Sequence, residues 1–454
     1  MAEARRFFAA QAWVAGAWAQ DVLLVSDADG LWSKMLVGCS LADRAGAEVL
    51  DGPVLPGLVD AHGHAFQRAI AGLTECAAPG HDDFWSWRDR MYAVAQRIGP
   101  EQLETIAAFL YTELLRAGYT QVCEFHYLHN DVNGRPYADP LQMSLALVRA
   151  AQRTGIGLTL LPTLYMRSGF GAAGLREDQR RFASTPDSVL RIAHDVRQAG
   201  SGSHTITAGI ALHSLRAVEE GAMLEVATAA RENGMPLHIH IAEQQREVDD
   251  CLQRHGRRPI EWLLDNVAVD EHWNLVHATR STPTELAGIH ERGASIVICP
   301  STEANLGDGT FDLRGWLEIG GRWSVGSDSH VTRSPMEELR LLEYSQRLAL
   351  HERNVAARAA GSDSSASVLF NGALEGGSAA AGLPCGGLAV GQRADFCVLD
   401  PSAPALAGIP AQRMLDALVF SSPESVMVRV CVAGCDVDTQ PQTGEFAALM
   451  RALW

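Results

Sequence analysis

Short apolar segments alternate with longer amphipathic ones through most of this 454-residue chain. The apolar segments are typical of buried strands, and they end near these positions: His64, His126, Leu164, His213, Ile241, His277, Cys299 and Asp328. Helices are predicted between them, over residues 101–117, 140–153, 186–198, 216–232, 258–266 and 283–292. Strands that alternate with helices favour a parallel sheet. Eight such units predict an α/β fold with a closed (β/α)8 TIM barrel.

The two ends of the chain lack this alternation. Residues 6–55 contain short β-branched and aromatic stretches between turns, with no obvious core of their own. Apolar segments 394–400 and 425–432, near the other end, have the same character. We therefore predict that both termini build one small β-sandwich-like domain. The expected division is 1–55 and 385–454 for this domain, and 56–384 for the barrel.

Composition limits the possible partners. A formal net charge of −17 argues against a nucleic-acid or anionic-membrane surface, because neither contact would gain from counterion release or lipid attraction. The nine cysteines include no Cys-x-x-Cys pair, so neither a disulfide framework nor a structural zinc module is indicated. No apolar run approaches the roughly 18–20 residues that a spanning helix needs, and no signal-peptide pattern is present. We expect a soluble cytoplasmic protein with a small-molecule ligand.

Pairs of histidines end two of the predicted strands. The apolar run 54–65 contains His62 and His64, which lie on one face because side chains alternate along a strand. His238 and His240 repeat this arrangement further along the chain. Imidazoles on one face of a strand can hold a metal ion together.

Three more polar residues follow predicted strands. Glu243 comes just after the second histidine pair, His277 ends the next strand, and Asp328 ends the eighth. A barrel places its active site at the carboxyl ends of its strands. The sequence therefore predicts a metal centre with His and Asp ligands at that end.

At these positions the chain resembles the amidohydrolase superfamily, whose pattern is His-x-His on strand 1, His on strands 5 and 6, and Asp on strand 8. Segments 54–57 and 387–395 also match its split small domain, so the resemblance covers essentially the whole chain. It implies the following metal ligands: His62, His64, His240 and Asp328. His238 competes with His240, which we favour because the His-x-x-Glu spacing of the deaminases pairs it with Glu243.

The number of metal ions follows from one residue type. Binuclear members of the superfamily bridge two ions with a carboxylated lysine, or sometimes another acid, at the end of strand 4. The only lysine in this chain is Lys34, in the N-terminal β region, so a barrel lysine bridge is impossible. We predict one Zn²⁺ per chain, and iron is the alternative because such ligand sets accept both.

The residue types also indicate a reaction. Zinc would lower the pKa of its water toward ~7, and Asp328 would accept the proton. Glu243 would protonate the substrate nitrogen and carry protons to departing ammonia. His277 would stabilise charge on the attacking oxygen. This set performs hydrolytic deamination or amide hydrolysis, and the metal site alone does not choose between them.

Several further stretches resemble the formimidoylglutamate deiminases of histidine degradation, among them residues 64–69, 84–88, 124–127, 213–218 and 301–309. The resemblance places substrate contacts at these residues: Gln67, Arg88, Tyr127, His213 and Arg216. Formimidoylglutamate has two carboxylates, and guanidinium groups bind carboxylates bidentately. The resemblance therefore implies hydrolysis of N-formimidoyl-L-glutamate to N-formyl-L-glutamate and ammonia. It also suggests a homodimer.

Two other functions stay open at this stage. A deaminase acting on a purine or pyrimidine would need amide and aromatic contacts in place of paired arginines. A non-catalytic barrel scaffold would have lost ligands, whereas every ligand position is intact here.

Three stretches receive structural predictions only. Trp85 and Trp87 are expected to pack in a loop, and loop 301–309 is expected to shape the pocket mouth without a substrate contact. Residues 353–367, rich in Ala, Arg, Ser and Asp, are predicted to form an exposed loop or a frayed helix end.

Overall fold

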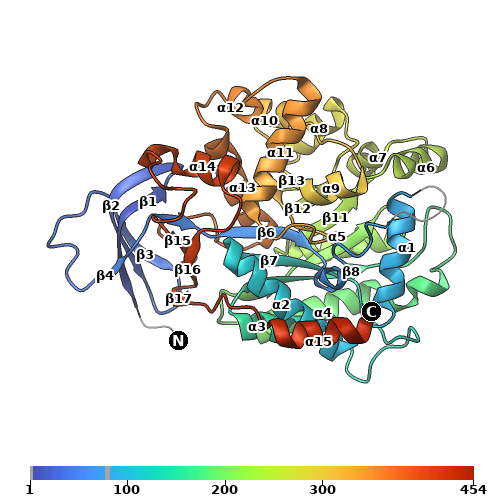
Figure 1. Cartoon of the computed structure of the whole chain (residues 1–454). Helices are drawn as coiled ribbons and strands as arrows, with labels where there is room; N and C mark the ends of the chain where they lie inside the picture. Colours follow the sequence, from blue (N-terminus) through green and yellow to red (C-terminus); the bar gives the residue numbers. More distant parts are fainter. Residues whose placement is uncertain (1–3, 77–81) are drawn as a thin grey trace.

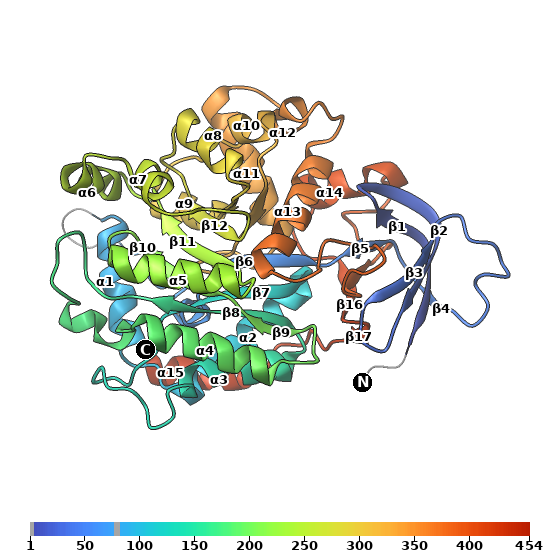
Figure 2. The ribbon, with the colours of Figure 1, turned by 180° about the vertical axis from the view of Figure 1, so that it is seen from behind.

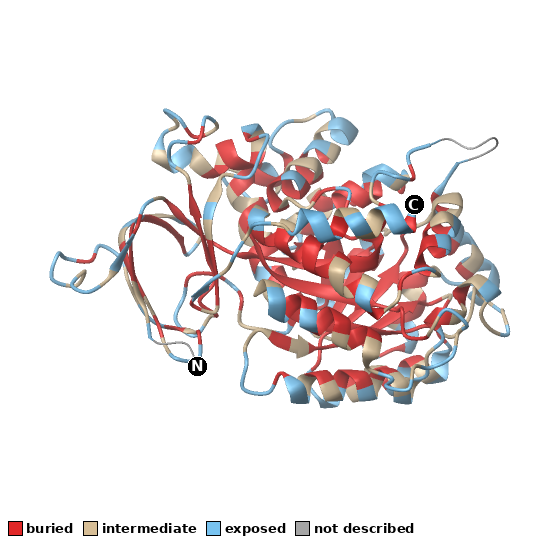
Figure 3. Ribbon diagram, turned by 60° about the horizontal axis from the view of Figure 1, so that its bottom comes forward, coloured by how far each residue is buried: buried red, intermediate tan, exposed pale blue. Residues whose placement is uncertain are grey.

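The computed structural model describes residues 4–76 and 82–454, and its larger part is a barrel of parallel strands surrounded by helices (Figure 1). In sheet order its strands are β6 (Leu58–Gly63), β7 (Tyr119–His126), β8 (Gly157–Leu164), β10 (Ile210–Ser214), β11 (Leu237–Ile241), β12 (Trp273–His277), β13 (Ser295–Ile298) and β14 (Trp323–Val325). A short strand, β9 (Ile206–Ala208), pairs with β8. The eight barrel strands are buried along their whole length, whereas Thr207 of β9 is half-buried (Figure 3). The predicted (β/α)8 barrel is confirmed.

The first and last strands meet at the residues predicted to hold the metal. The Asp328 amide donates to the His62 carbonyl at 2.9 Å, and the His64 amide donates to the Asp328 carbonyl at 3.2 Å. Below this junction the buried Asp60 carboxylate accepts from the amide and hydroxyl of Ser327, at 2.8 and 2.6 Å. The barrel therefore closes through the backbone of its own candidate site.

Helices cover the outside of the barrel (Figures 1 and 2). They are α1 (Phe84–Ala95), α2 (Pro100–Ala117), α3 (Gln142–Thr154), α4 (Pro186–Ala199), α5 (Glu220–Glu232), α6 (Gln245–His255), α7 (Pro259–Asn266), α8 (Pro283–Glu291), α9 (Pro300–Leu306), α10 (Leu313–Glu318), α11 (Pro335–Leu350), α12 (Val355–Ala359) and α13 (Ser365–Ala381). Short 3-10 turns η1 (Ala65–Ala69) and η2 (Glu177–Phe182) lie between them. None of the helices in the described ranges is long and apolar enough to span a membrane.

Several of these helices begin at a Ser-Pro or Thr-Pro pair. The hydroxyls of Thr185, Thr282 and Ser334 accept hydrogen bonds from first-turn amides of α4, α8 and α11. Proline in the next position has no amide to leave unpaired and has its φ preset for a helix. These pairs explain why the predicted starts of α4 and α8 were accurate.

Three local predictions were wrong. The helix predicted from residue 216 begins at Glu220, because Ser214 to Ala217 forms a turn closed by a backbone hydrogen bond of 3.0 Å. Trp85 and Trp87 lie on α1 and not in a loop, and α9 occupies most of segment 301–309.

Segment 353–367 is also more ordered than predicted, because α12 and the start of α13 lie within it. Val355, Ala356 and Ala357 are buried. The Glu343 carboxylate of α11 accepts from the amides of Val355 and Ala356, at 2.8 and 3.0 Å. A cap supplied by a distant helix leaves no signal in the segment itself.

The two ends of the chain share one smaller sheet, as predicted. Its order is β17-β16-β15-β5-β1-β2-β3, with β4 beside β1. The strands are β1 (Arg6–Val14), β2 (Ala17–Ser26), β3 (Trp32–Leu36), β4 (Glu48–Leu50), β5 (Val54–Pro56), β15 (Phe396–Leu399), β16 (Met427–Val432) and β17 (Cys435–Asp436). Phe7, Trp32 and Phe396 contact one another in its core, which explains why residues 6–55 alone lacked one. Lys34 lies on β3, away from the barrel.

The C-terminal segment also adds helices that cover the barrel. They are α14 (Met414–Ser421), preceded by the turn η3 (Ala411–Arg413), and α15 (Thr443–Leu453). Phe446 of α15 stacks on Phe109 of α2, with ring centroids 4.1 Å apart. The Trp454 indole donates to the Ala69 carbonyl at 3.0 Å. The chain's end is thereby packed against the first segments of the barrel.

A buried ion pair joins the small sheet to the barrel. Arg393 and Asp395, just before β15, form a salt bridge of 2.6 Å between nearly inaccessible side chains. The same guanidinium donates to the Gln121 side chain at 2.7 Å and to the Thr120 carbonyl at 3.2 Å, both at the start of β7. Both charges are therefore paired, and the remaining guanidinium donors of Arg393 form hydrogen bonds across the junction between the small sheet and the barrel.

Replacing Arg393 with methionine should lower the free energy of unfolding by about 3–5 kcal/mol, because it leaves the Asp395 charge buried without a partner. The measurement is the urea midpoint followed by circular dichroism. Arg149→Met is the matched control, since its ion pair with Glu104 lies on the surface and should contribute at most about 1 kcal/mol. Equal stability of the two variants would contradict the prediction.

Candidate active site and metal centre

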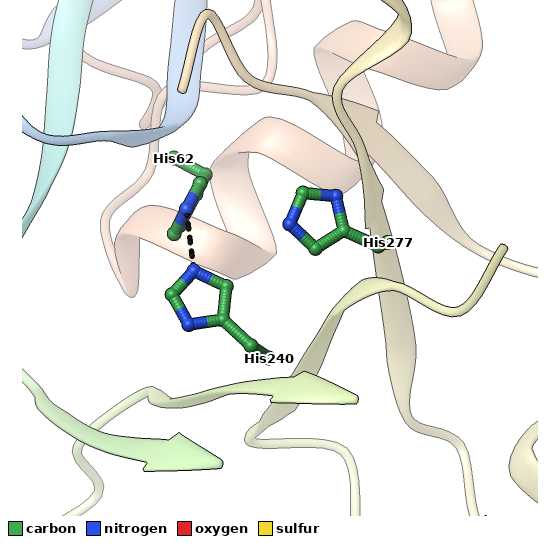
Figure 4. Close-up of side chains that lie close together, drawn as sticks. All are labelled: His62, His240 and His277. Atoms are coloured by element: carbon green, nitrogen blue, oxygen red, sulfur yellow. Dashed lines mark hydrogen bonds between the residues drawn. The ribbon is translucent and has the colours of Figure 1, made fainter. Parts of the chain in front are cut away.

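The predicted ligands converge at the carboxyl ends of three strands. His62 and His64 come from β6, His240 from β11, and Asp328 follows β14. All four are buried. Figure 4 shows His62 and His240 meeting ring to ring, with His277 of β12 beside them.

The ligand atoms lie close together. Nε2 of His62 is 3.0 Å from Nε2 of His240 and 3.4 Å from an Asp328 carboxylate oxygen. Nε2 of His64 is 3.3 Å from the same oxygen. The atoms that could hold a metal form two overlapping groups that share His62: one with His64 and Asp328, the other with His240 and His277. Ligand atoms from different strands therefore lie close enough together for a metal ion.

Hydrogen bonds on the far side of two rings orient these nitrogens. Nδ1 of His64 lies 2.8 Å from the Phe125 carbonyl, and Nδ1 of His240 lies 3.0 Å from the His213 carbonyl. A carbonyl only accepts, so each Nδ1 carries the proton and each Nε2 presents a lone pair toward the centre. Lone pairs that face one another repel unless a cation lies between them. The donor set therefore fits a divalent metal ion.

His238 is oriented differently from its neighbour. Its Nε2 lies 2.9 Å from the Ala380 carbonyl near the end of α13, and it does not belong to the converging cluster of metal-ligating atoms. It serves as a hydrogen-bonded core residue. This geometry favours His240 over His238 as the ligand from β11.

His277 lies among three carboxylates. Its Nε2 is 3.7 Å from Glu243 and 3.8 Å from Asp328, and its Nδ1 is 3.3 Å from Glu303 of α9. Burial alone would lower its pKa, but the three negative charges outweigh burial and raise the pKa to about 10. Glu303 is itself fixed by the Cys299 amide, which donates to it at 2.9 Å.

Glu243 lies in the segment between β11 and α6, with its carboxylate beside His277. Burial raises its pKa above the usual value, although the positive His277 opposes the shift. Its amide donates to the Glu247 carboxylate of α6 at 3.2 Å. Burial also raises the pKa of Glu247, to about 7. A chain of buried acids thus leads from the centre toward α6.

Backbone strain is concentrated at this end of the barrel. Left-handed backbone conformations occur at Ala242, His277, Ala278, Asp328 and His330, with φ between 48° and 70°. Such conformations cost non-glycine residues on the order of 1–3 kcal/mol and persist at functional sites that over-determine them. Here they turn the chain sharply after β11, β12 and β14.

A pocket of about 440 Å³ opens onto the centre. All five residues predicted to contact substrate line it: Gln67, Arg88, Tyr127, His213 and Arg216. Gln67 donates to the Tyr127 hydroxyl at 3.2 Å. Burial, followed by the nearby Arg216 charge, holds the pKa of His213 well below its usual value, so this ring is neutral. The pocket therefore combines neutral donors with two fixed positive charges.

The two pocket arginines have few partners of their own. The Nε atoms of Arg88 and Arg216 are buried without a hydrogen-bond partner among the described residues. The ion pair recorded for Arg88 is a 3.9 Å contact with exposed Asp89. The Trp85 ring lies under both guanidinium groups, at 4.5 and 5.7 Å from its centroid. Glu247 and Glu243 act on Arg216 at longer range and raise its pKa, but no described carboxylate forms a close ion pair with it. Arginines without a close ion pair in a pocket indicate an anionic ligand.

Sequence reasoning missed the acids that support the site. Glu303 lies within segment 301–309, for which only pocket shaping was expected, and it contacts His277 directly. Glu247 follows Glu243 by one helical turn. Trp87, expected to pack in a loop, lines the pocket from α1. Glu303 lies between Thr302 and Ala304, and Glu247 lies between Arg246 and Val248, so neither local sequence identifies the residue that the acid contacts.

Comparison with known proteins agrees with this geometry. The family model described as the amidohydrolase family matches residues 54–435. The chain belongs to the amidohydrolase family. Its resemblance to that family, argued above from the ligand pattern, is confirmed.

Individual relatives within the family show more specifically which proteins the chain is similar to. The chain is 47% identical over 431 residues to a protein of Pseudomonas aeruginosa named formimidoylglutamate deiminase, covering 94% of this chain and 93% of that one. It is 28% identical to a 5-methylthioadenosine/S-adenosylhomocysteine deaminase of Halobacterium salinarum, over 80% of this chain and 77% of that one. This amidohydrolase is therefore a homologue of formimidoylglutamate deiminase.

Solved structures show the same architecture. The crystal structure of an amidohydrolase from Brucella melitensis superposes with a TM-score of 0.91 at 38% identity, covering 99% of both chains. An adenosine deaminase from Xanthomonas campestris with bound zinc gives 0.79 at 21% identity, over 99% of this chain and 98% of that one. The similarity to the adenosine deaminase, at 21% identity, shows a shared fold alone.

The purified protein should contain about one divalent metal ion per chain, and His240→Ala should lose most of it, because one of four ligands is removed. Elemental analysis gives the metal content. A chelator should lower the melting temperature of the wild-type protein, since an ion that binds only the folded state stabilises it.

The control for this experiment is His238→Gln on the same strand, which can still donate to the Ala380 carbonyl. It should keep its metal. Loss of metal from His238→Gln, with a full complement in His240→Ala, would show that the ligand from β11 is assigned wrongly.

Proposed function

We propose that this amidohydrolase hydrolyses N-formimidoyl-L-glutamate to N-formyl-L-glutamate and ammonia, a step in histidine degradation. The observation that carries the proposal is the position of Arg88 and Arg216, with unpartnered buried Nε atoms, on a pocket that ends at the metal centre. The substrate has a carboxylate-bearing end and an amidine end. The name of the 47% identical relative supports the same substrate.

The carboxylate end of the substrate would bind the two arginines. Guanidinium groups donate two parallel hydrogen bonds to a carboxylate, and burial strengthens charged hydrogen bonds. Gln67 and Tyr127, which are hydrogen-bonded to each other, and neutral His213 line the same pocket. These groups would orient the chain of the substrate so that the formimidoyl carbon faces the centre.

The following residues would hold one metal ion: His62, His64, His240 and Asp328. When bound, such an ion supplies Lewis acidity that lowers the pKa of water toward ~7 and polarises the electrophile. The ion is proposed to be zinc, with iron as the alternative accepted by the same ligand types.

The surrounding side chains would move the protons. Asp328 accepts a proton from the attacking water, and the new C–O bond makes the formimidoyl carbon tetrahedral. Glu243 delivers a proton to the terminal nitrogen and is reprotonated from Asp328, so that nitrogen receives two protons in turn. The attacking oxygen then gives its second proton to Asp328 and becomes the formyl carbonyl, the bond from carbon to the terminal nitrogen breaks, and ammonia leaves. His277 stabilises negative charge on the attacking oxygen through its proton at Nε2. Glu243 and Asp328 both lie within 4 Å of that imidazole nitrogen, which lets one ring serve the whole step.

The small domain of residues 1–55 and 385–454, the barrel of residues 56–384, a homodimer and a cytoplasmic location complete the proposal. Paired ion-binding arginines favour it over a purine or pyrimidine deaminase, whose substrate offers no carboxylates for them. The full set of ligands favours an enzyme over a barrel scaffold.

Asp328→Asn should abolish ammonia release from N-formimidoyl-L-glutamate while leaving the fold intact, because an amide cannot accept the proton of the attacking water. An ammonia assay and circular dichroism measure the two effects. Parallel assays with guanine, cytosine and adenosine test the substrate. Near-normal turnover by the variant would disprove the proton-accepting role.

Arg216→Ala should raise KM for N-formimidoyl-L-glutamate more than tenfold, because a lost charged hydrogen bond costs about 1.5–3 kcal/mol. Steady-state kinetics measure the change. Arg216→Lys is the matched variant, since it keeps the charge but loses the fork and should give an intermediate KM. An unchanged KM in both variants would remove Arg216 from the binding site.

A further inference from the structure

A second hollow lies outside the catalytic pocket, between α1 and α6. It encloses about 1420 Å³ of open space, compared with about 440 Å³ for the inner pocket. Both helices lie at the end of the barrel away from the small sheet (Figures 1 and 2). Arg88 and Arg216 line both spaces, so the outer hollow, here called the vestibule, adjoins the inner pocket at these two side chains.

The vestibule is positively charged on a strongly acidic protein. The charged residues that line it are five arginines and two aspartates: Arg88, Arg176, Arg216, Arg246, Arg254, Asp89 and Asp250. The whole chain has a formal net charge of −17. A dianion approaching most of this molecule is repelled, whereas the vestibule attracts it.

The Trp85 ring contacts three of these arginines but does not neutralise their positive charge. Its ring lies 4.5 Å from the guanidinium carbon of Arg88, 5.7 Å from that of Arg216 and 4.7 Å from that of Arg246. The face of an aromatic ring attracts cations through its quadrupole but carries no net charge. Trp85 thus holds like charges together and leaves their charge available to a ligand.

The outer arginines on α6 are free to meet that ligand. Arg246 is mostly exposed, and its contact with Asp250 is loose at 3.8 Å. Arg254 is exposed and lies about two turns further along α6. Arg176 is different, because Asp89 holds it at 2.9 Å. The available outer charge therefore belongs to α6.

We propose that Arg246 and Arg254, with Trp85, form an outer docking site for small dicarboxylates, from which the substrate passes to Arg88 and Arg216. The site raises the local concentration of the dianionic substrate at the pocket mouth, and it determines specificity for doubly charged ligands. This inference rests on the proposed function, since that function supplies the dicarboxylate.

The test is the double variant Arg246→Gln/Arg254→Gln, with Arg149→Gln/Arg153→Gln on α3 as a control that makes the same change in net charge away from the vestibule. At ~10 mM ionic strength, where the Debye length is about 30 Å, the first variant should lose kcat/KM for N-formimidoyl-L-glutamate by about tenfold. Its kcat should stay within about twofold, because the inner residues are untouched. The difference should vanish in ~1 M NaCl, where charges beyond about 3 Å are screened.

Binding of glutarate, measured by calorimetry, tests the same site without turnover. Weaker binding by the Arg246→Gln/Arg254→Gln variant than by the control supports the vestibule. Equal kcat/KM and equal glutarate affinity overturn it, as does a loss that persists unchanged in high salt. Failure of the wild-type protein to release ammonia would instead overturn the proposed function, and the glutarate comparison would still decide the vestibule.

Discussion

Two backbone hydrogen bonds, between the end of β6 and Asp328, close the barrel and fix its chemistry together. The Asp328 amide and carbonyl pair with His62 and His64, so the junction that joins the first and last strands also sets three of the four candidate ligands. β11 pairs in parallel with β12, which carries His277. His240, on β11, therefore reaches the same end of the barrel. The left-handed conformation of Asp328, at φ 48°, turns its carboxylate toward the imidazoles and persists because backbone hydrogen bonds to His62 and His64 hold it.

The site buries several carboxylates close together, and other groups in the site must compensate their negative charge. Glu243, Glu303 and Asp328 surround His277, and Glu247 lies behind Glu243. Unpaired buried carboxylates are costly, so each requires a cation or a proton. His277 supplies one positive charge, the metal ligand set calls for another, and Arg216 provides a third next to Glu247. The same cations that make these acids tolerable also make the pocket attractive to a carboxylate substrate.

The barrel and the grouping of the candidate metal ligands were predictable from sequence because each depends on a local pattern. Apolar strands show in composition, and alternation along a strand places His62 and His64 on one face. The residues that escaped prediction depend on partners far away in the chain. Glu303 contacts His277 only because α9 folds back over that residue. The helix α12 is ordered because the Glu343 carboxylate of α11 caps its first turn. In sequence, only the spacing to Glu243 favoured His240 over His238. In the structure, the Ala380 carbonyl at the end of α13 holds His238 away from the site.

The position of the arginines separates recognition from chemistry. The reacting groups stand on strands or just beyond them, where ladder hydrogen bonds and buried packing hold them rigidly. Arg88 and Arg246 stand on α1 and α6, and Arg216 lies in the turn after β10. These elements lie outside the barrel ladder, so changes in them alter the charge of the entrance without moving β6, β11 or β14. A single hydrolytic centre can therefore serve ligands of different charge, with the choice made by the side chains around Trp85.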